Sequence, residues 1–320
     1  MGKEIVFPKG KGRGISNNSK EIIKESYNIL NEINPATVRA DAYRLFTAGL
    51  IPDMKTGTVA KVGKQLGYAR DNGIIPWKWI VDENRSVERP VLWDDPDERL
   101  DHMISTYRRD NWQDQPNWVE VWSEKGTVRG ILAPVLDEYG IPFRVQHGFG
   151  SKTVLHDVAI QTQYASKPLT ILYVGDYDPS GMYMSEVDIP NRIGYYNGFA
   201  TINRIALTKD DVLDDKGKEK LPSFPAKDKE KDPRYHWFVA NYGEKCWELD
   251  ALSPVTIRQR VENEIIKMLD MDIWNRSLHI EKVEVDAFYH YQDSWKESIS
   301  HLVAKYSVSD TSQENSATRQ

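Results

Sequence analysis

The stretch Leu169–Gly181 reads L-T-I-L-Y-V-G-D-Y-D-P-S-G, and the rest of the chain is best interpreted outward from it. Its first half, Leu169–Val174, joins aliphatic, aromatic and β-branched residues, which predicts a buried strand. After Gly175 come Asp176 and Asp178, whose side chains point the same way in extended chain. Two carboxylates at a strand end, with no Lys or Arg beside them in the sequence, repel unless a cation lies between them. Oxygen ligands of this kind predict Mg²⁺, with Mn²⁺ as the other option.

Strand and helix patterns alternate on both sides of this stretch, from Trp118 onward. Strands are predicted over residues 119–122, 143–146, 169–174 and 201–207, with an edge strand at 237–239. Helices are predicted over residues 126–139, 151–164, 180–193, from a turn at 248 to 269, and over 287–305. The alternation predicts an α/β fold with a mostly parallel, doubly wound sheet.

The N-terminal region has apolar residues at helical spacing. Three short helices are predicted, over residues 19–33, across the stripe from 38 to 46, and over 56–70, followed by a strand or wing at 74–82. This order is typical of a winged helix-turn-helix DNA-binding domain. Lys61 and Lys64 face away from the apolar stripe of the third helix, and Lys55 precedes it. The alternative is a small helical cap with solvated lysines.

Charge is distributed unevenly along the chain. The net charge of −6 by itself argues against a nucleic-acid partner. The first 90 residues, however, carry 15 Lys and Arg against 10 Asp and Glu, and the remainder carries 27 against 38. This asymmetry suggests an N-terminal part that meets phosphates and an acidic remainder that holds metal. The alternative is an ordinary solvated surface.

These patterns predict five segments. They are a flexible basic arm (1–19), a winged-helix domain (20–90), a charged linker with a helix from Pro96 to Arg109 (91–117), the α/β domain (118–306) and a disordered tail (307–320). A single cysteine, Cys246, excludes an intrachain disulfide and a multi-cysteine zinc site. With no apolar run long enough to cross a membrane and no signal peptide in the sequence, we expect a cytoplasmic protein without a membrane partner.

A third carboxylate joins the Asp pair. The sequence V-E-V-W-S-E-K-G places Glu124 at the end of the first strand of the α/β region, as Asp176 and Asp178 follow a later one. Because parallel strands end at the same sheet edge, the three side chains are expected to share one divalent metal ion. Glu248 and Asp250 either extend this site or cap the helix from Pro254, and the cap is the interpretation we favour.

One further phosphate contact is suggested by G-F-G-S-K-T, residues 148–153. It lacks the full spacing of a phosphate-binding loop. Lys152 at a helix N-terminus is a candidate contact for a DNA phosphate. A plain strand–helix turn is the alternative.

The acidic motifs resemble those of a known family. S-E-K-G after one strand and G-D-x-D-P-S-G after a later one are similar to the Toprim domain shared by topoisomerases, primases and some nucleases. W-E-L-D-A-L-S-P (Trp247 to Pro254) resembles a segment of the A subunit of topoisomerase VI. The meiotic double-strand-break transesterase shares that layout, in which a winged helix precedes the Toprim domain.

The resemblance implies Mg²⁺-dependent cleavage of double-stranded DNA by a homodimer. In that family a Tyr four positions after an Arg attacks the phosphodiester, which here implies Tyr43 with Arg39. Arg39 or Arg44 would favour the phenolate. Strand passage would need a separate ATPase subunit, since no ATPase region is recognisable in this sequence. Two alternatives stay open: water as the nucleophile with Tyr43 in the helix core, or a non-catalytic DNA-binding protein.

Overall fold

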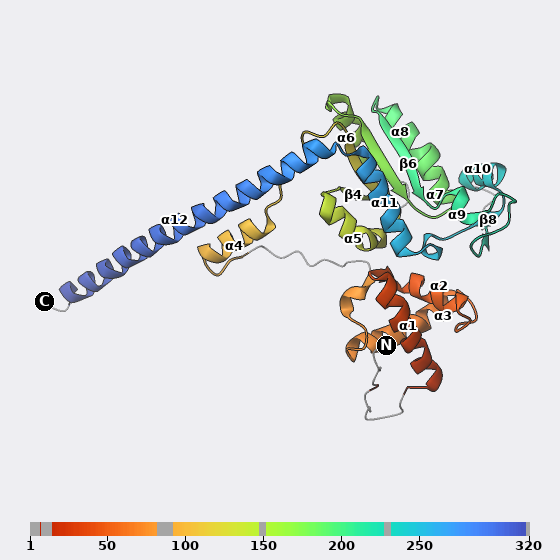
Figure 1. The fold of residues 1–320 in the computed structure, drawn as a ribbon, viewed down its shortest axis with the longest axis horizontal. Helices are drawn as coiled ribbons and strands as arrows, with labels where there is room; N and C mark the ends of the chain where they lie inside the picture. The colour runs from red at the N-terminus through yellow and green to blue at the C-terminus, as the bar shows by residue number, and fades with distance from the viewer. Residues whose placement is uncertain (1–6, 8–14, 82–91, 147–151, 227–231, 318–320) are drawn as a thin grey trace. The chain divides into compact units, whose positions relative to one another are not determined.

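The computed structural model describes Phe7 and residues 15–81, 92–146, 152–226 and 232–317. The chain divides into two compact units. The first comprises Met1–Asn84 and Pro116–Leu269, and the second Arg85–Gln115 and Asp270–Gln320. The first unit therefore contains both the N-terminal helices and the α/β region (Figure 1). The predicted arm, except for Phe7 and residues 15–19, lies outside the described residues.

A four-stranded parallel sheet forms the centre of the α/β region, as the sequence predicts. Its strands are β3 (Trp118–Ser123), β4 (Phe143–Val145), β5 (Leu169–Val174) and β6 (Ala200–Ala206), in the order β4-β3-β5-β6. Ser123 pairs with Val174, so β3 and β5 end level with each other. Whatever follows these two residues therefore lies at one edge of the sheet.

The connections make that edge a switch point. The helices of this region are α5 (Thr127–Tyr139), α6 (Lys152–Tyr164), α7 (Pro179–Tyr183), α8 (Ile189–Tyr195), α9 (Lys209–Val212), α10 (Pro233–Tyr242) and α11 (Pro254–Met268). From β3 the chain passes through α5 to β4 on one side, and from β5 through α7 and α8 to β6 on the other. Neighbouring strands whose connections part in this way leave a crevice at their carboxyl ends, where α/β proteins bind ligands.

Two predicted elements differ from the structure. The predicted edge strand at 237–239 is wrong, because these residues lie inside α10. Asp232 accepts a hydrogen bond from the Arg234 amide and Pro233 occupies the first turn, which is a helix start signal. The predicted helix over 180–193 is interrupted by a π-helical turn, Met184–Asp188. Pro190 follows that turn and has no amide hydrogen for an α-helical bond.

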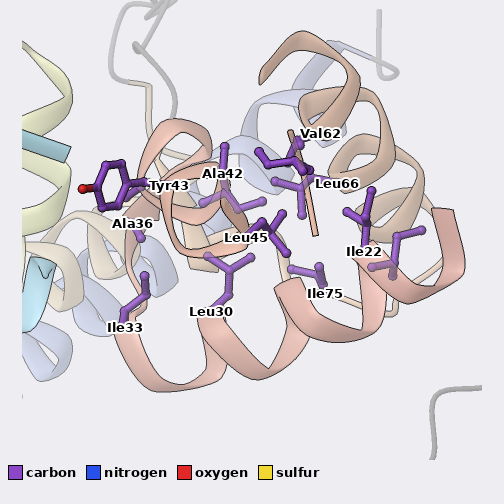
Figure 2. Packing of buried hydrophobic residues seen from close by; sticks show 14 of the residues in the cluster. Ile22, Leu30, Ile33, Ala36, Ala42, Tyr43, Leu45, Val62, Leu66 and Ile75 are labelled. Atoms are coloured by element: carbon purple, nitrogen blue, oxygen red, sulfur yellow. The ribbon is translucent and has the colours of Figure 1, made fainter. Parts of the chain in front are cut away.

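The N-terminal region has the three predicted helices. They are α1 (Asn17–Ile33), α2 (Val38–Thr47) and α3 (Thr56–Asp71), followed by a short 3₁₀ turn, Trp77–Trp79. Strand β2 (Ile80–Val81) lies within the segment predicted as a strand or wing, and it pairs in parallel with β1 (Ala36–Thr37), which lies between α1 and α2. The winged helix therefore stays a prediction. The helices enclose a buried core of aliphatic side chains (Figure 2).

The helical region packs directly on the α/β region. Arg258 of α11 donates to the carbonyls of Pro35 and Asn34, at 3.3 and 3.2 Å. The Val81 side chain lies against Gly130 so closely that a Cβ there would meet it at 2.4 Å. These contacts explain why the N-terminal helices and the α/β region up to Leu269 form one compact unit, while residues 270–306 of the predicted α/β domain belong to the second unit.

The second unit pairs the predicted linker helix with the C-terminal helix. Helix α4 (Pro96–Thr106) starts where the sequence predicts, and α12 (Met271–Ala317) contains the predicted helix over 287–305. Glu284 of α12 accepts hydrogen bonds from Tyr107 at 2.7 Å and Arg109 at 2.5 Å. Helix α12 continues to Ala317, where the sequence predicts a disordered tail from 307. In the described part of the chain, no helix combines the length and apolar character that crossing a membrane requires.

Candidate acidic site at the carboxyl end of the sheet

The backbone that carries the Asp pair is held by a partly buried arginine of the neighbouring strand. Arg204 of β6 donates to the carbonyls of Gly175 at 3.1 Å, Gly181 at 3.0 Å and Leu207 at 2.7 Å, and also to the carbonyl of Asp176. Burial lowers the pKa of Arg204, and the nearby anionic groups partly offset this effect. One side chain thus fixes the loop between β5 and α7, which aims the carboxylates.

Asp178 and Gly181 give the D-x-D-P-S-G motif its shape. Asp178 is the N-cap of α7, and its Oδ1 accepts a hydrogen bond from the Gly181 amide at 2.7 Å. A Cβ at Gly181 would lie 2.4 Å from the Asp176 carbonyl oxygen. The motif therefore needs glycine at this position, because backbone and not a flexible side chain occupies the space.

Gly181→Ala is expected to destabilise the protein by about 2 kcal/mol, because the added methyl forces the loop away from Asp176. The measurement is the free energy of unfolding from urea titration. Gly194→Ala is the matched control, since nothing lies within 4 Å of a Cβ there and alanine favours helix. Equal stabilities of the two variants would contradict the close approach at Gly181.

A third segment reaches the site through the fold. The backbones of Tyr177 and Trp247 exchange two hydrogen bonds, at 2.9 and 3.0 Å. The Leu249 amide then donates to Asp176 Oδ1 at 2.7 Å. Glu248 and Asp250 do not cap the helix at Pro254, so that interpretation is wrong. Their side chains instead bind Arg39 and Lys125, two cations from other parts of the chain.

Lys125 is a cation close to Asp176 in space, although no Lys or Arg lies beside the Asp pair in the sequence. Its Nζ lies 2.8 Å from Asp176 Oδ1 and 3.5 Å from Asp250 Oδ2. Burial alone would lower the pKa of Lys125, but Asp176 and Asp250 together raise it above its usual value. The Asp pair therefore has a positive neighbour, contrary to the expectation from its local sequence. The signal was present, because Lys125 directly follows Glu124 in S-E-K-G.

Glu124 and Asp178 form the part of the site without such a partner. Glu124 is half-buried and makes no hydrogen bond or ion pair to any residue that the structure describes. Burial raises its pKa, and the negative charges of Asp178 and Asp176 raise it further. Burial also raises the pKa of Asp178, although the Gly181 amide opposes this. Both carboxylates are therefore in a state that a bound cation would relieve.

The donor set suits Mg²⁺, but the described side chains are not already gathered around one point. Among residues 15–81, 92–146, 152–226 and 232–302, no group of three or more acidic, His or Cys side chains forms a ready metal site. Asp176 Oδ1 is held by Lys125 and the Leu249 amide, and Asp178 Oδ1 by its cap bond. Metal binding would thus use the remaining oxygens and a turn of the Glu124 side chain.

A cavity of about 300 Å³ opens beside the Asp pair. Its polar wall contains Asp176, Asp178 and Glu248, and its apolar wall includes Phe224 and Trp247. The lining thus combines carboxylates with aromatic side chains. This combination leaves room for a polar ligand next to the carboxylates.

Arg39 and Tyr43 lie one turn apart on α2. Arg39 pairs with Glu248 through two hydrogen bonds, one of them at 2.6 Å. Tyr43 is 6% exposed, and its hydroxyl has no hydrogen-bond partner in the described chain. Its ring lies at the end of the helical core, with the hydroxyl pointing away from the other labelled side chains (Figure 2). Burial raises the pKa of Tyr43 to about 12, while Arg44 lowers it.

The basic residues that the sequence assigns to DNA binding are all exposed. They are Arg44, Lys55, Lys61, Lys64 and Lys152. Lys55 lies 3.6 Å from an Asp53 carboxylate oxygen, and the other four make no ion pair within the described residues. They are therefore accessible to phosphates. The loop before Lys152, residues 147–151, lies outside the described residues.

Comparisons with known proteins leave the family of this chain undecided. No protein-family model matches the sequence, and a search of curated proteins finds no match.

Proposed function

We propose that this protein cleaves DNA phosphodiester bonds in a Mg²⁺-dependent reaction at Glu124, Asp176 and Asp178. The observation that carries the proposal is the pair Glu124 and Asp178, two partly buried carboxylates that form no ion pair with any described residue and lie at the switch point of a parallel sheet. The resemblance of the acidic motifs to Toprim and topoisomerase VI A sequences supports the same reaction.

Each residue group has a part in the proposed reaction. Exposed lysines on and before α3, Lys55, Lys61 and Lys64, would contact the DNA backbone. Glu124, Asp176 and Asp178 would hold Mg²⁺, which when bound polarises a phosphoryl oxygen and stabilises the leaving oxygen. Arg204 would keep the loop with the Asp pair in place through its carbonyl contacts.

The nucleophile has two candidates, and the burial of Tyr43 favours water. A buried phenol with a pKa of about 12 is protonated at neutral pH and needs movement to reach DNA. Tyrosine transesterification is the second candidate. It is supported by the Arg39 spacing and by the absence of a hydrogen bond to the Tyr43 hydroxyl within the described residues. A homodimer and an ATPase subunit belong to this second candidate.

Tyr43→Phe is expected to leave Mg²⁺-dependent cleavage of supercoiled DNA within about twofold of the parent, because water does not need the phenol. The measurement is the rate of nicked and linear product formation. Tyr68→Phe on α3 is the control for loss of a tyrosine hydroxyl. A loss of cleavage of about 10³-fold, together with loss of a covalent protein–DNA adduct seen in the parent, would establish transesterification instead.

The non-catalytic alternative has its own outcome in the same assay. Absence of product with Mg²⁺ and with Mn²⁺, on supercoiled, relaxed and linear DNA, would leave DNA binding as the function. Retained DNA binding that weakens with salt would then identify a binding protein.

A further inference from the structure

The acidic site is divided into a half with an ion pair to Lys125 and a half without an ion pair to any described residue. Asp176 and Asp250 share the Lys125 ammonium, at 2.8 and 3.5 Å. Glu124 and Asp178 form no ion pair with a residue that the structure describes, and the nearby cations, Lys125 with Arg234 or Arg204, offset the rise of their pKa values only in part. The two halves meet at Asp176, which is next to both Lys125 and the Glu124–Asp178 pair.

We infer that Lys125 is a built-in cation that takes the place of a second metal ion, so that the site binds one divalent ion, at Glu124, Asp178 and the remaining oxygen of Asp176. This inference rests on the proposed function and specifies its metal stoichiometry. Several classes of phosphate-cleaving enzymes use two divalent ions about 4 Å apart. Here the position between Asp176 and Asp250 is already filled by a positive charge.

The environment of Lys125 holds it in that position. The oxygen that accepts from Lys125, Asp176 Oδ1, also accepts from the Leu249 amide at 2.7 Å. Asp250 is fixed from its other side, because Thr37 donates to Oδ1 at 2.5 Å. The side chains of Asp176 and Asp250 are 14% and 10% exposed, so water screens the ion pairs weakly. Displacing Lys125 would leave two partly buried carboxylates unpaired.

A fixed ammonium also serves the proposed reaction. It lowers the local negative charge beside the metal-binding half, which allows a DNA phosphate to approach. A second metal ion bound weakly would need a higher metal concentration for the same effect, whereas the Lys125 ammonium is always present. Lys125 acts here through Asp176 and the local field, so it is a positioning residue.

The test is the number of Mn²⁺ ions bound per chain, measured by equilibrium dialysis and titration calorimetry at neutral pH without DNA. We expect one ion for the parent and two for Lys125→Met, because the freed Asp176 and Asp250 then bind a cation. Lys125→Arg keeps the charge and is expected to bind one. Lys125→Met with Asp250→Asn removes a ligand of the second ion and is expected to return to one. Circular dichroism confirms that each variant is folded.

The outcomes separate this inference from the proposed function. One ion in both the parent and folded Lys125→Met overturns the role of Lys125 and leaves the metal site intact. No ion in the parent but one in Lys125→Met removes the proposed metal site while keeping the built-in cation. No ion in either removes both.

A second measurement needs no variant, in case Lys125→Met does not fold. Acetylation of Lys125 by an amine-reactive reagent, followed by mass spectrometry, reports whether its ammonium is displaced. We expect its labelling rate to change less than about twofold when Mn²⁺ is added, because the ion binds elsewhere. A rise of about tenfold or more would mean that metal replaces Lys125, and would overturn the inference.

Discussion

Glu124→Gln is expected to lower Mg²⁺-dependent DNA cleavage by about 10³-fold, the largest effect among the changes considered, because a charged ligand becomes neutral. The same change is expected to raise the stability of the metal-free protein. Burial and two negative neighbours raise the pKa of Glu124, so its ionised form opposes folding at neutral pH. A neutral amide removes that repulsion.

Added Mn²⁺ should reverse the order of stability. The parent gains free energy of unfolding as the ion binds the folded state, whereas Glu124→Gln gains little. The measurement is thermal unfolding without Mn²⁺ and with Mn²⁺ at 5–10 times its dissociation constant. At that concentration, binding is expected to stabilise the parent by about 1 kcal/mol. Glu138→Gln, an exposed acid on α5, is the control and should behave as the parent. If Glu124→Gln cleaves DNA normally, the proposed metal site is wrong.

Asp41→Asn is expected to remove a pH dependence of stability on the order of 2 kcal/mol between pH 5 and pH 7. Asp41 is fully buried in the helical core, and its pKa is raised to about 7, mainly by burial. Its Oδ2 accepts from Ser26 at 2.8 Å, while Oδ1 has no partner among the described residues. In the unfolded chain the same carboxyl titrates near 4.

The direction in which stability changes with pH depends on whether the folded or the unfolded protein binds the Asp41 proton more tightly. Between pH 4 and pH 7 the folded protein keeps Asp41 protonated and the unfolded chain does not. The stability that Asp41 contributes is therefore present below pH 4 and is lost as the pH rises to about 7. Asparagine does not titrate, so the Asp41→Asn variant does not lose this stability as the pH rises.

Urea unfolding at pH 5, 6 and 7 measures the difference. Other titrating groups are shared by both proteins and cancel in the comparison. Ser26→Ala is a useful second variant, since the Ser26 hydrogen bond lowers the pKa of Asp41 and its loss should extend the pH dependence upward. Parallel stability curves for the parent and Asp41→Asn would show that Asp41 does not titrate in this range.

Much of the fold could be predicted because local signals agree with it. The Leu169–Val174 strand has the bounds that its apolar run predicts, and α3 begins at Thr56 as expected. Predictions failed where one signal outweighed another. The β-branched and aromatic residues at 237–239 suggested a strand, but Asp232-Pro233 starts a helix through them.

In the candidate site, too, the sequence predicted the residues with a local signal and missed contacts between distant segments. Glu124, Asp176 and Asp178 could be predicted as one group because each lies within four residues of a strand end, and strand ends of a parallel sheet share an edge. Lys125 could not be given its role, since its partner Asp250 is distant in sequence and joins the site through the pairing of Tyr177 with Trp247. No periodicity or spacing encodes such a contact.

The sequence alone determined the parallel α/β sheet, the three N-terminal helices and the edge at which the acidic motifs meet, because these depend on residues near one another along the chain. Tertiary structure alone decided which carboxylates of the described chain form ion pairs. It paired Arg39 with Glu248, placed Lys125 between two aspartates and buried Tyr43. Charge balance and burial depend on what packs nearby in space, and that is set only when distant segments come together.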